Sequence, residues 1–228
     1  MQKLLKYLWK KIQNNARLRK TCAKIYNGIS KNHKTIRGKG NKINYENAFL
    51  KKVSINIIGN NNNVTIKQNV HLINTNILII GDNHKIEIDE NCIIRNSGFC
   101  FEDDNCKIVI GKRTTAEGIQ VASLESNSSI TIGDDCMFSA GISIRNSDSH
   151  SIIDIKTNKR INQAKDIVIG NHTWIGEAVR ILKGSVIGNN CVIGVGSIVT
   201  KLIPNNCVAV GIPAKVVKEN TTWTRKRL

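Results

Sequence analysis

Aromatic residues and proline are scarce in this sequence. Of its 228 residues, 4% are Phe, Trp or Tyr and two are Pro, while 40% are hydrophobic, so Ile and Val supply most of the apolar side chains. Residues branched at Cβ favour strands over helices. The hydrophobic content excludes disorder of the whole chain, and the length suffices for one sizeable core or two small ones.

Acidic residues are absent from residues 1–45, which contain 13 of the 34 Lys and Arg residues. The rest of the chain has 21 basic and 17 acidic residues, so a strongly basic segment precedes a nearly balanced body. Apolar residues recur in the basic segment at the spacing of a helix face, at Leu4, Leu8, Ile12, Leu18, Cys22 and Ile25. This pattern predicts one or two amphipathic basic helices.

A membrane-spanning segment is also missing from the sequence. No apolar run approaches the roughly 20 residues that a spanning helix needs, and Lys6, Lys10 and Lys11 interrupt what would be the core of a signal peptide. We therefore expect a cytoplasmic protein whose residues 1–45 either rest on an anionic membrane, at its inner face, or pack on the body. Aromatic side chains for base stacking are sparse in this segment, so no nucleic-acid partner is expected.

The seven cysteines form no C-x-x-C pair, and their odd number excludes complete pairing in disulfides. Neither a disulfide framework nor a zinc ribbon is therefore predicted. Free thiols fit a reducing compartment, which agrees with the cytoplasm.

A six-residue repeat fills much of the C-terminal half. From Ile169 onward it comprises IGNHTW, IGEAVR, ILKGSV, IGNNCV, IGVGSI and VTKLIP, in which an aliphatic residue leads every hexad. The fifth residue of the first five hexads is small or β-branched. A period of six does not keep residues on one face of an α-helix, but it suits a short strand followed by a turn. Three hexads would form one triangular coil of about 18 residues, with the aliphatic side chains inside a solenoid.

Weaker copies of the repeat extend upstream, and several begin with Ile-Gly followed by Asn, Asp or Lys, as expected at corners. Their spacing drifts, so the boundaries of the early coils stay open. We assign residues 46–218 to an all-β solenoid domain, residues 1–45 to the basic helical segment and residues 219–228 to a basic tail.

The stretch from Trp174 to Lys218 has the most specific motifs. It contains a W-I-G opening, G-V-G-S-I-V-T-K at 194–201 and G-I-P-A-K at 211–215. These motifs resemble the hexapeptide-repeat acyltransferases, especially the branch of galactoside and maltose acetyltransferases and polysaccharide O-acetyltransferases. The resemblance implies a left-handed parallel β-helix, acetyl-CoA as the acyl donor, and homotrimers with active sites between neighbouring solenoids.

The same resemblance implies where CoA binds. Small side chains would let the pantetheine arm approach the backbone of the coils, and lysines near the end of the repeat would hold phosphate charges. The residues expected to contact the cofactor are Trp174, Gly176, Ala178, Gly196, Thr200, Lys201, Pro213 and Lys215.

The polar stretch 145–166 interrupts the hexads and is predicted to be a functional loop. In the resembled transferases, a histidine at the base of such a loop is the general base, and the neutral imidazole suits this role near pH 7. We therefore expect His150 to be catalytic and Asp148 to orient its imidazole. Asn146 is the expected contact with the substrate and, with Ser143 and the Trp174 indole, a candidate donor to the oxyanion.

These observations predict an acetyl-CoA-dependent O-acetyltransferase that modifies a saccharide of a capsule, lipopolysaccharide or related surface glycan. Two alternatives stay open: an N-acetyltransferase of an amino sugar or other small amine, and a non-enzymatic basic solenoid that binds nucleic acid or anionic lipid. Zinc catalysis would need three converging histidines. His150 and His172 are separated by a loop and no third histidine is near, so no metal is expected.

Overall fold

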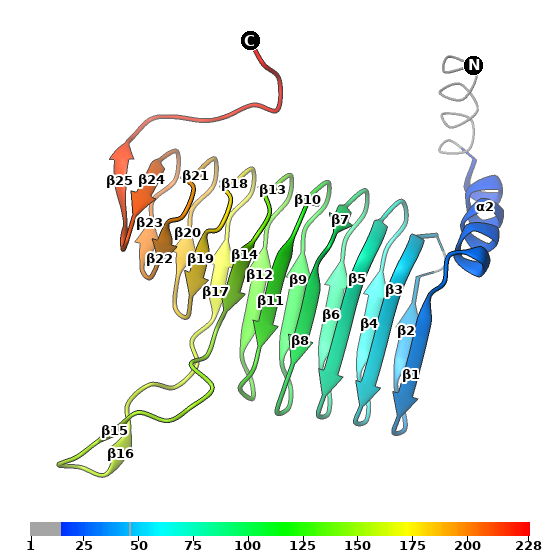
Figure 1. The fold of residues 1–228 in the computed structure, drawn as a ribbon, viewed down its shortest axis with the longest axis horizontal. Coiled ribbons are helices and arrows are strands. Elements are labelled where there is room, and N and C mark those ends of the chain that lie inside the picture. Colours follow the sequence, from blue (N-terminus) through cyan, green and yellow to red (C-terminus); the bar gives the residue numbers. More distant parts are fainter. Residues whose placement is uncertain (1–14, 46) are drawn as a thin grey trace.

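The predicted solenoid is confirmed. A computed structural model describes residues 15–45 and 47–228, in which parallel strands wrap into stacked coils behind one N-terminal helix, α2 (Ala16–Ile29) (Figure 1). Each coil contributes to three faces. The long strands β3 (Phe49–Ile58) and β5 (His71–Ile80) each turn a corner and thereby join two faces into one 15-stranded sheet.

The three faces are named here in the order in which the chain visits them. Face 1 consists of β1 (His33–Arg37), the second halves of β3 and β5, β8 (Gly98–Phe101), β11 (Ile119–Ser123), β14 (Ile142–Arg145), β19 (Arg180–Leu182) and β22 (Ile198–Val199). Face 2 consists of β2 (Lys42–Asn44), β4 (Asn63–Ile66), β6 (Lys85–Ile88), β9 (Lys107–Ile110), β12 (Ser129–Ile132), β17 (Ile167–Ile169), β20 (Val186–Ile187) and β23 (Leu202–Ile203). Face 3 consists of the first halves of β3 and β5, β7 (Ile93–Arg95), β10 (Thr115–Ala116), β13 (Met137–Phe138), β18 (Trp174–Ile175), β21 (Val192–Ile193), β24 (Val208–Gly211) and the antiparallel β25 (Ala214–Lys218).

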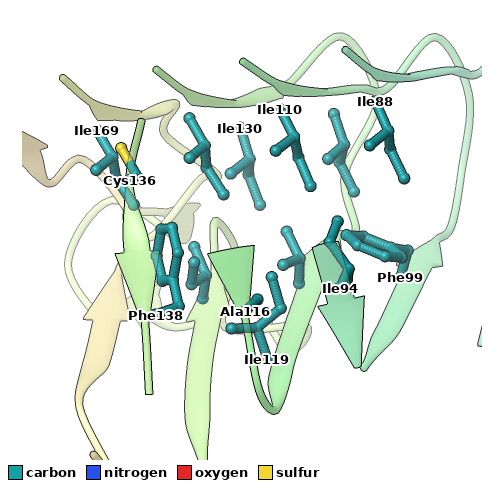
Figure 2. Close-up of a cluster of buried hydrophobic side chains, with 14 of the residues drawn as sticks. Ile88, Ile94, Phe99, Ile110, Ala116, Ile119, Ile130, Cys136, Phe138 and Ile169 are labelled. Carbon is teal, nitrogen blue, oxygen red and sulfur yellow. The ribbon is translucent and has the colours of Figure 1, made fainter. Parts of the chain in front are cut away.

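Aliphatic side chains from the three faces meet along the axis and form one continuous core (Figure 2). In Figure 2, Ile88 and Ile110 of face 2 point toward Ile94 and Ala116 of face 3, and all four are fully buried. The leading residue of every hexad is at most 1% exposed, which confirms its predicted position: Ile169, Ile175, Ile181, Ile187, Ile193 and Val199. The fifth residues share this interior and are fully buried: Thr173, Val179, Ser185, Cys191 and Ser197.

The glycine that follows the leading residue is required by the close stacking of coils. A Cβ atom at Gly170 would lie 2.7 Å from the carbonyl carbon of Gly188, and one at Gly176 would lie 2.8 Å from the backbone nitrogen of Val195. Real Cβ atoms essentially never approach that closely. The regular spacing of these glycines within the repeat therefore has a steric cause.

The early coils are longer than the predicted length of about 18 residues. The amide of Asp82 donates to the Asp104 carboxylate 22 residues further on, whereas the amide of Asn171 donates to the Asn189 side chain 18 residues further on. The prediction is thus right just after the loop and wrong before it. Strands of four residues replace strands of two on face 2, and this adds length to each early coil.

Asparagine accounts for the extra residues at the early corners. Asn61, Asn83, Asn105 and Asn127 follow one another along one corner, with φ of 56°, 61°, 59° and 62°. This left-handed conformation is tolerated by Asn better than by most side chains other than Gly. The Asn-rich composition therefore reflects the turning of the chain at the corners.

The solenoid begins earlier than residue 46, so the predicted boundary is wrong. β1 pairs with β3, and β2 pairs with β4, within the segment that was assigned to the basic helices. Every β1 side chain is exposed, because this first coil is covered by a neighbouring coil on one side only. Without buried positions the repeat signal is absent there. Of the predicted helices, α2 is observed, and the apolar positions from Leu4 to Ile12 lie outside the described residues.

Helix α2 covers the open edge of β3. The side chain of Asn27 accepts from the Leu50 amide at 2.7 Å and donates to the Ala48 carbonyl at 3.0 Å. Asn32 similarly bonds the Leu50 carbonyl and the Val53 amide. The two side chains thus replace a missing strand neighbour. In residues 15–45 and 47–228, no helix is long and apolar enough to cross a membrane.

Truncation of one stacked side chain should destabilise the solenoid. Ile108→Ala leaves a cavity between Ile86 and Ile130 on face 2, and we expect it to lower the free energy of unfolding by about 2–5 kcal/mol. Urea unfolding followed by circular dichroism measures the change. Val168→Ala, at an outward position on the same face, is the control and should cost less than about 1 kcal/mol. Equal losses in the two variants would contradict this account of the core.

Candidate active site

The segment between β14 and β17 leaves the solenoid at the corner between faces 1 and 2 (Figure 1). It carries a short hairpin of β15 (Ile153–Asp154) and β16 (Lys159–Arg160), which projects away from the coils. Ile130 nevertheless pairs with Ile167, so the next coil continues in register below the loop. The insertion therefore adds a projecting arm without interrupting the core.

Glu125 holds the base of this loop on the solenoid. Its Oε1 accepts from the Arg160 guanidinium at 2.6 Å and from the Ser147 hydroxyl, and its Oε2 accepts from the Ala164 amide at 3.2 Å. Burial alone would raise the pKa of the Glu125 carboxyl, but the hydrogen bonds from Arg160 and Ser147 outweigh it and lower this pKa. A carboxylate thus joins both ends of the loop.

Asn162 fixes the backbone on both sides of His150. Its Nδ2 donates to the His150 carbonyl at 2.8 Å, and its Oδ1 accepts from the Ile152 amide at 2.7 Å. Asn162 is buried, with 7% of its surface exposed, whereas His150 is exposed. The chain position of His150 is therefore held firmly while its imidazole is open to solvent.

Asp148 does not have the partner that was predicted for it. Its Oδ2 accepts from the Lys183 ammonium at 2.5 Å and from Asn162 Nδ2 at 2.8 Å, and these two bonds lower the pKa of the carboxyl. Among the hydrogen bonds of the described residues, none joins Asp148 to the His150 imidazole. The carboxylate ties the loop to the next coil through Lys183, so the role of orienting His150 is corrected to one of anchoring.

Asn146 lies in the core and is not available to a substrate. It is fully buried, and its Nδ2 donates to the hydroxyls of Ser123 and Ser128, both at 2.9 Å. Its Oδ1 accepts from the Leu124 amide at 3.2 Å. The predicted substrate contact is therefore wrong: the side chain closes a polar cluster under the loop. Ser143 remains half-buried on the outer side of face 1, in register with Arg180.

Three of the predicted CoA contacts stack at the corner between faces 3 and 1. Ala178 and Gly196 have φ of 57° and 69°, and the Gly196 amide donates to the Glu177 carbonyl at 2.8 Å. Gly176 precedes them at the end of β18 and is buried. Trp174 lies beside this corner on face 3, where it is 37% exposed. Gly176, Ala178 and Gly196 thus contribute little side-chain bulk to this corner.

The remaining predicted contacts divide between this corner and the opposite edge of face 1. Thr200 and Lys201 follow β22 and lie at the corner that bears the loop. Pro213 and Lys215 belong to the turn after β24 and to β25, and the Gly211 amide of this turn donates to the Ser197 hydroxyl at 3.0 Å, beside Gly196. Between the two corners lies the outer side of face 1, and the five steps of extended chain from Ala178 to Lys183 span about 16 Å.

His172 has a structural environment. Its ring stacks on Trp223 with centroids 4.4 Å apart, and its Nδ1 lies 2.8 Å from the Asp135 carboxylate. Arg225 also donates to Asp135, so residues of the C-terminal tail hold this corner. Burial would raise the pKa of Asp135, but the bonds from His172 and Arg225 lower it. No three His, Cys, Asp or Glu side chains of residues 15–45 and 47–228 are grouped to hold a metal ion.

Comparisons with known proteins agree with this architecture. The model of the bacterial transferase hexapeptide family (six repeats) matches residues 166–201. The crystal structure of the polySia-specific acetyltransferase NeuO covers 86% of this chain with 37% identity and a TM-score of 0.78, and 89% of that chain is matched. The polysialic acid O-acetyltransferase OatWY has 30% identity and a TM-score of 0.68, covering 86% of this chain and 92% of that one.

The chain belongs to the hexapeptide-repeat transferase family. The left-handed parallel β-helix expected from the resemblance is therefore confirmed, as is a basic N-terminal helix, which was expected from the spacing of apolar residues. A curated relative, the polysialic acid O-acetyltransferase of Escherichia coli O1:K1 / APEC, is 43% identical over 116 residues, which are 50% of this chain and 37% of that protein. The chain thus spans well under two thirds of the length of this curated relative.

Three polar residues of this hexapeptide-repeat protein were not identified from the sequence. Glu125 precedes the loop, Asn162 is one of several amides within it, and Lys183 occupies a hexad between Ile181 and Ser185. Nothing in the repeat pattern marks them, because their partners come from segments far apart in the chain. Lys183 does not stand out either, because the third position of the six hexads is Asn, Glu, Lys, Asn, Val and Lys in turn.

Loss of the Glu125 carboxylate should loosen the loop. We expect Glu125→Gln to speed amide hydrogen exchange in residues 147–165 by about tenfold or more at pH 7, because charged hydrogen bonds are lost. The pKa of the Glu125 carboxyl is lowered in the folded state. The extra protection of the wild-type loop is therefore complete above the ordinary pKa of 4.5, and it disappears as the pH falls through the folded-state pKa. Mass spectrometry that compares exchange in the wild type and in Glu125→Gln, at pH 7 and at a pH below the folded-state pKa, tests this prediction.

Glu117→Gln is the matched control, because Glu117 pairs with Arg95 in an exposed position away from the loop. It should leave exchange in the loop unchanged. A loop that exchanges equally in the wild type and in Glu125→Gln at pH 7 would remove Glu125 as its anchor.

Proposed function

We propose that this chain is an acetyl-CoA-dependent O-acetyltransferase that acts on a hydroxyl of a saccharide in a capsule, lipopolysaccharide or related surface glycan. The observation that carries the proposal is the exposed His150 on a clamped loop of a hexapeptide-repeat solenoid. The names of the relatives support a saccharide as acceptor, because NeuO and OatWY act on polysialic acid. Transfer to an amino group remains the alternative within the same family.

His150 is the general base in this proposal. Its neutral imidazole takes the proton of the sugar hydroxyl while that oxygen attacks the acetyl carbonyl. The bond between the carbonyl carbon and sulfur then breaks, and the imidazolium returns its proton to the departing thiolate. Asn162 acts as a positioning residue, since it holds the backbone at His150 and Ile152.

The small-residue corner supplies the binding surface for the acyl donor. Acetyl-CoA brings an activated thioester and several phosphate charges. Ala178 and Gly196 add little side-chain bulk to their corner, and open space surrounds the position of a Cβ at Gly196, which fits a thin pantetheine arm. Lys201 and Lys215 are exposed cations that suit the phosphates.

A homotrimer is part of the proposal. In one chain the loop with His150 and the small-residue corner lie along opposite edges of face 1. If solenoids stand side by side, the loop of one chain approaches the corner of the next. This arrangement supports an active site between neighbouring chains.

We place the reaction in the cytoplasm, at the inner face of the membrane. All seven cysteines are free, which supports a reducing compartment. The basic residues 1–45 support peripheral contact with an anionic membrane.

Removal of the proposed base should abolish most of the activity. We expect His150→Ala to lower kcat by about 10²–10⁴ while the affinity for CoA stays similar. Thiol release from acetyl-CoA with a panel of glycans, including polysialic acid, measures turnover, and calorimetry with CoA measures binding. Mild alkali then separates product classes, because esters hydrolyse and amides persist.

Lys156→Ala, on the exposed hairpin, is the control for damage to the loop and should retain turnover. Near-normal turnover in His150→Ala would exclude the mechanism. An alkali-stable product would replace the O-acetyl assignment with N-acetyl transfer.

A further inference from the structure

Helix α2 has an apolar face that the solenoid does not cover. Leu18, Ile25 and Ile29 are 43%, 62% and 78% exposed, and Cys22 is partly exposed. At intervals of four, three and four residues these side chains lie along one line of the helix. We call these four residues the outer stripe. The apolar positions predicted from the sequence thus face away from the body.

The orientation of the outer stripe is set by the contacts of a different side of the helix. Ala23 is fully buried against the solenoid, and the Tyr26 ring lies edge-on to Phe49 with centroids 5.8 Å apart. Asn27 adds the two hydrogen bonds to β3 described above. The helix cannot roll to bury the stripe without breaking these contacts.

Basic residues flank the outer stripe. Arg17, Lys20 and Lys24 lie on the side of α2 between the stripe and the contact with the body, and all three are exposed. Lys20 and Lys24 line a hollow of about 520 Å³ beside Tyr45. Because residues 1–45 contain no acidic residue, the attraction for anions is not offset locally.

We propose that the outer stripe inserts into the interfacial region of an anionic lipid bilayer, with Lys20 and Lys24 among the headgroups. Apolar side chains beside lysines are the composition of helices that lie in the membrane interface. A second copy of this helix would bring a second set of basic residues and be repelled. Nucleic acid would satisfy the lysines, but it offers no apolar phase to Ile25 and Ile29.

This inference deepens the membrane contact proposed above and does not depend on acetyl transfer. The sequence immediately before α2 has the same character, since Leu5, Leu8 and Trp9 alternate there with Lys6 and Lys10.

Vesicle flotation with the full chain tests the inference. We expect the wild type to float with vesicles of equal parts phosphatidylglycerol and phosphatidylcholine, but not with phosphatidylcholine alone. Ile25→Ser/Ile29→Ser should lower the partition coefficient by about tenfold or more, because two apolar side chains lose their transfer into the interface. Lys20→Gln/Lys24→Gln should weaken binding at low salt and reduce its salt dependence.

Ile58→Ser/Ile80→Ser is the matched control, because these residues are 46% and 41% exposed on neighbouring strands and do not belong to α2. It should float like the wild type, and circular dichroism should show that all variants are folded. Unchanged flotation of Ile25→Ser/Ile29→Ser would overturn the inference, even if residues 1–14 bind lipid.

A change in oligomeric state of that variant without lipid, measured by light scattering, would also overturn the inference, since it would assign the stripe to a second copy. Turnover with a soluble acceptor separates the two proposals. The stripe variant should keep wild-type turnover whether or not it binds vesicles. Loss of flotation with retained turnover supports the inference, whereas failure of the transferase proposal would show as absent turnover in the wild type.

Discussion

The stacking of one inward side chain on its equivalent in the next coil is the constraint on which this molecule depends. Parallel strands lie about 4.8 Å apart, so each face must present a residue of similar shape at that spacing. The inward positions that stack from coil to coil are filled by Ile, Val, Leu and, in a few coils, Phe. Because the strands must stay in register, coil length can change at the corners and at the strand ends, and steps of 22, 18 and 16 residues coexist in one solenoid.

The same constraint explains where the candidate active site lies. The step across the loop is 37 residues, from Asp134 to Asn171, yet the strands on both sides remain paired. An insertion of this size is tolerated because it leaves at a corner, where no inward residue is required. Glu125, Asn162 and Lys183 then hold its base, so a projecting segment has a defined anchor. A rigid prism with one anchored arm suits a reaction that needs a base at a fixed position.

The sequence predicted those features that arise from local repetition. The buried positions after Ile169 follow directly from the hexads, because each strand of the hexads has two or three residues and each turn is short. Coil length before the loop was not predictable, since left-handed Asn residues add chain without adding a buried position. The boundary at residue 46 failed because β1 has a single covered side and needs no aliphatic pattern.

Contacts between distant segments were beyond the sequence for a different reason. Asp148 was expected to orient the His150 imidazole, but its carboxylate pairs with Lys183 of the next coil. Asn146 was assigned to the loop, but it is fully buried and donates hydrogen bonds to Ser123 and Ser128. A polar residue at the start of an insertion either closes the coil below or faces the ligand. The stacking of the coils determines which of these two positions the residue takes, and the order of residues in the sequence does not show it.

The length of the solenoid relates the two proposed surfaces. Helix α2 packs on β3, and the loop leaves after β14, four strand spacings further along face 1. At about 4.8 Å per spacing, the helix and the base of the loop are about 19 Å apart along the axis. A solenoid that rests on a bilayer through α2 with its axis along the membrane normal would hold the base of the loop above the lipid headgroups rather than among them. Such a position suits an acceptor that extends from the membrane as a glycan chain, and it suits less an acceptor group that lies in the membrane interface.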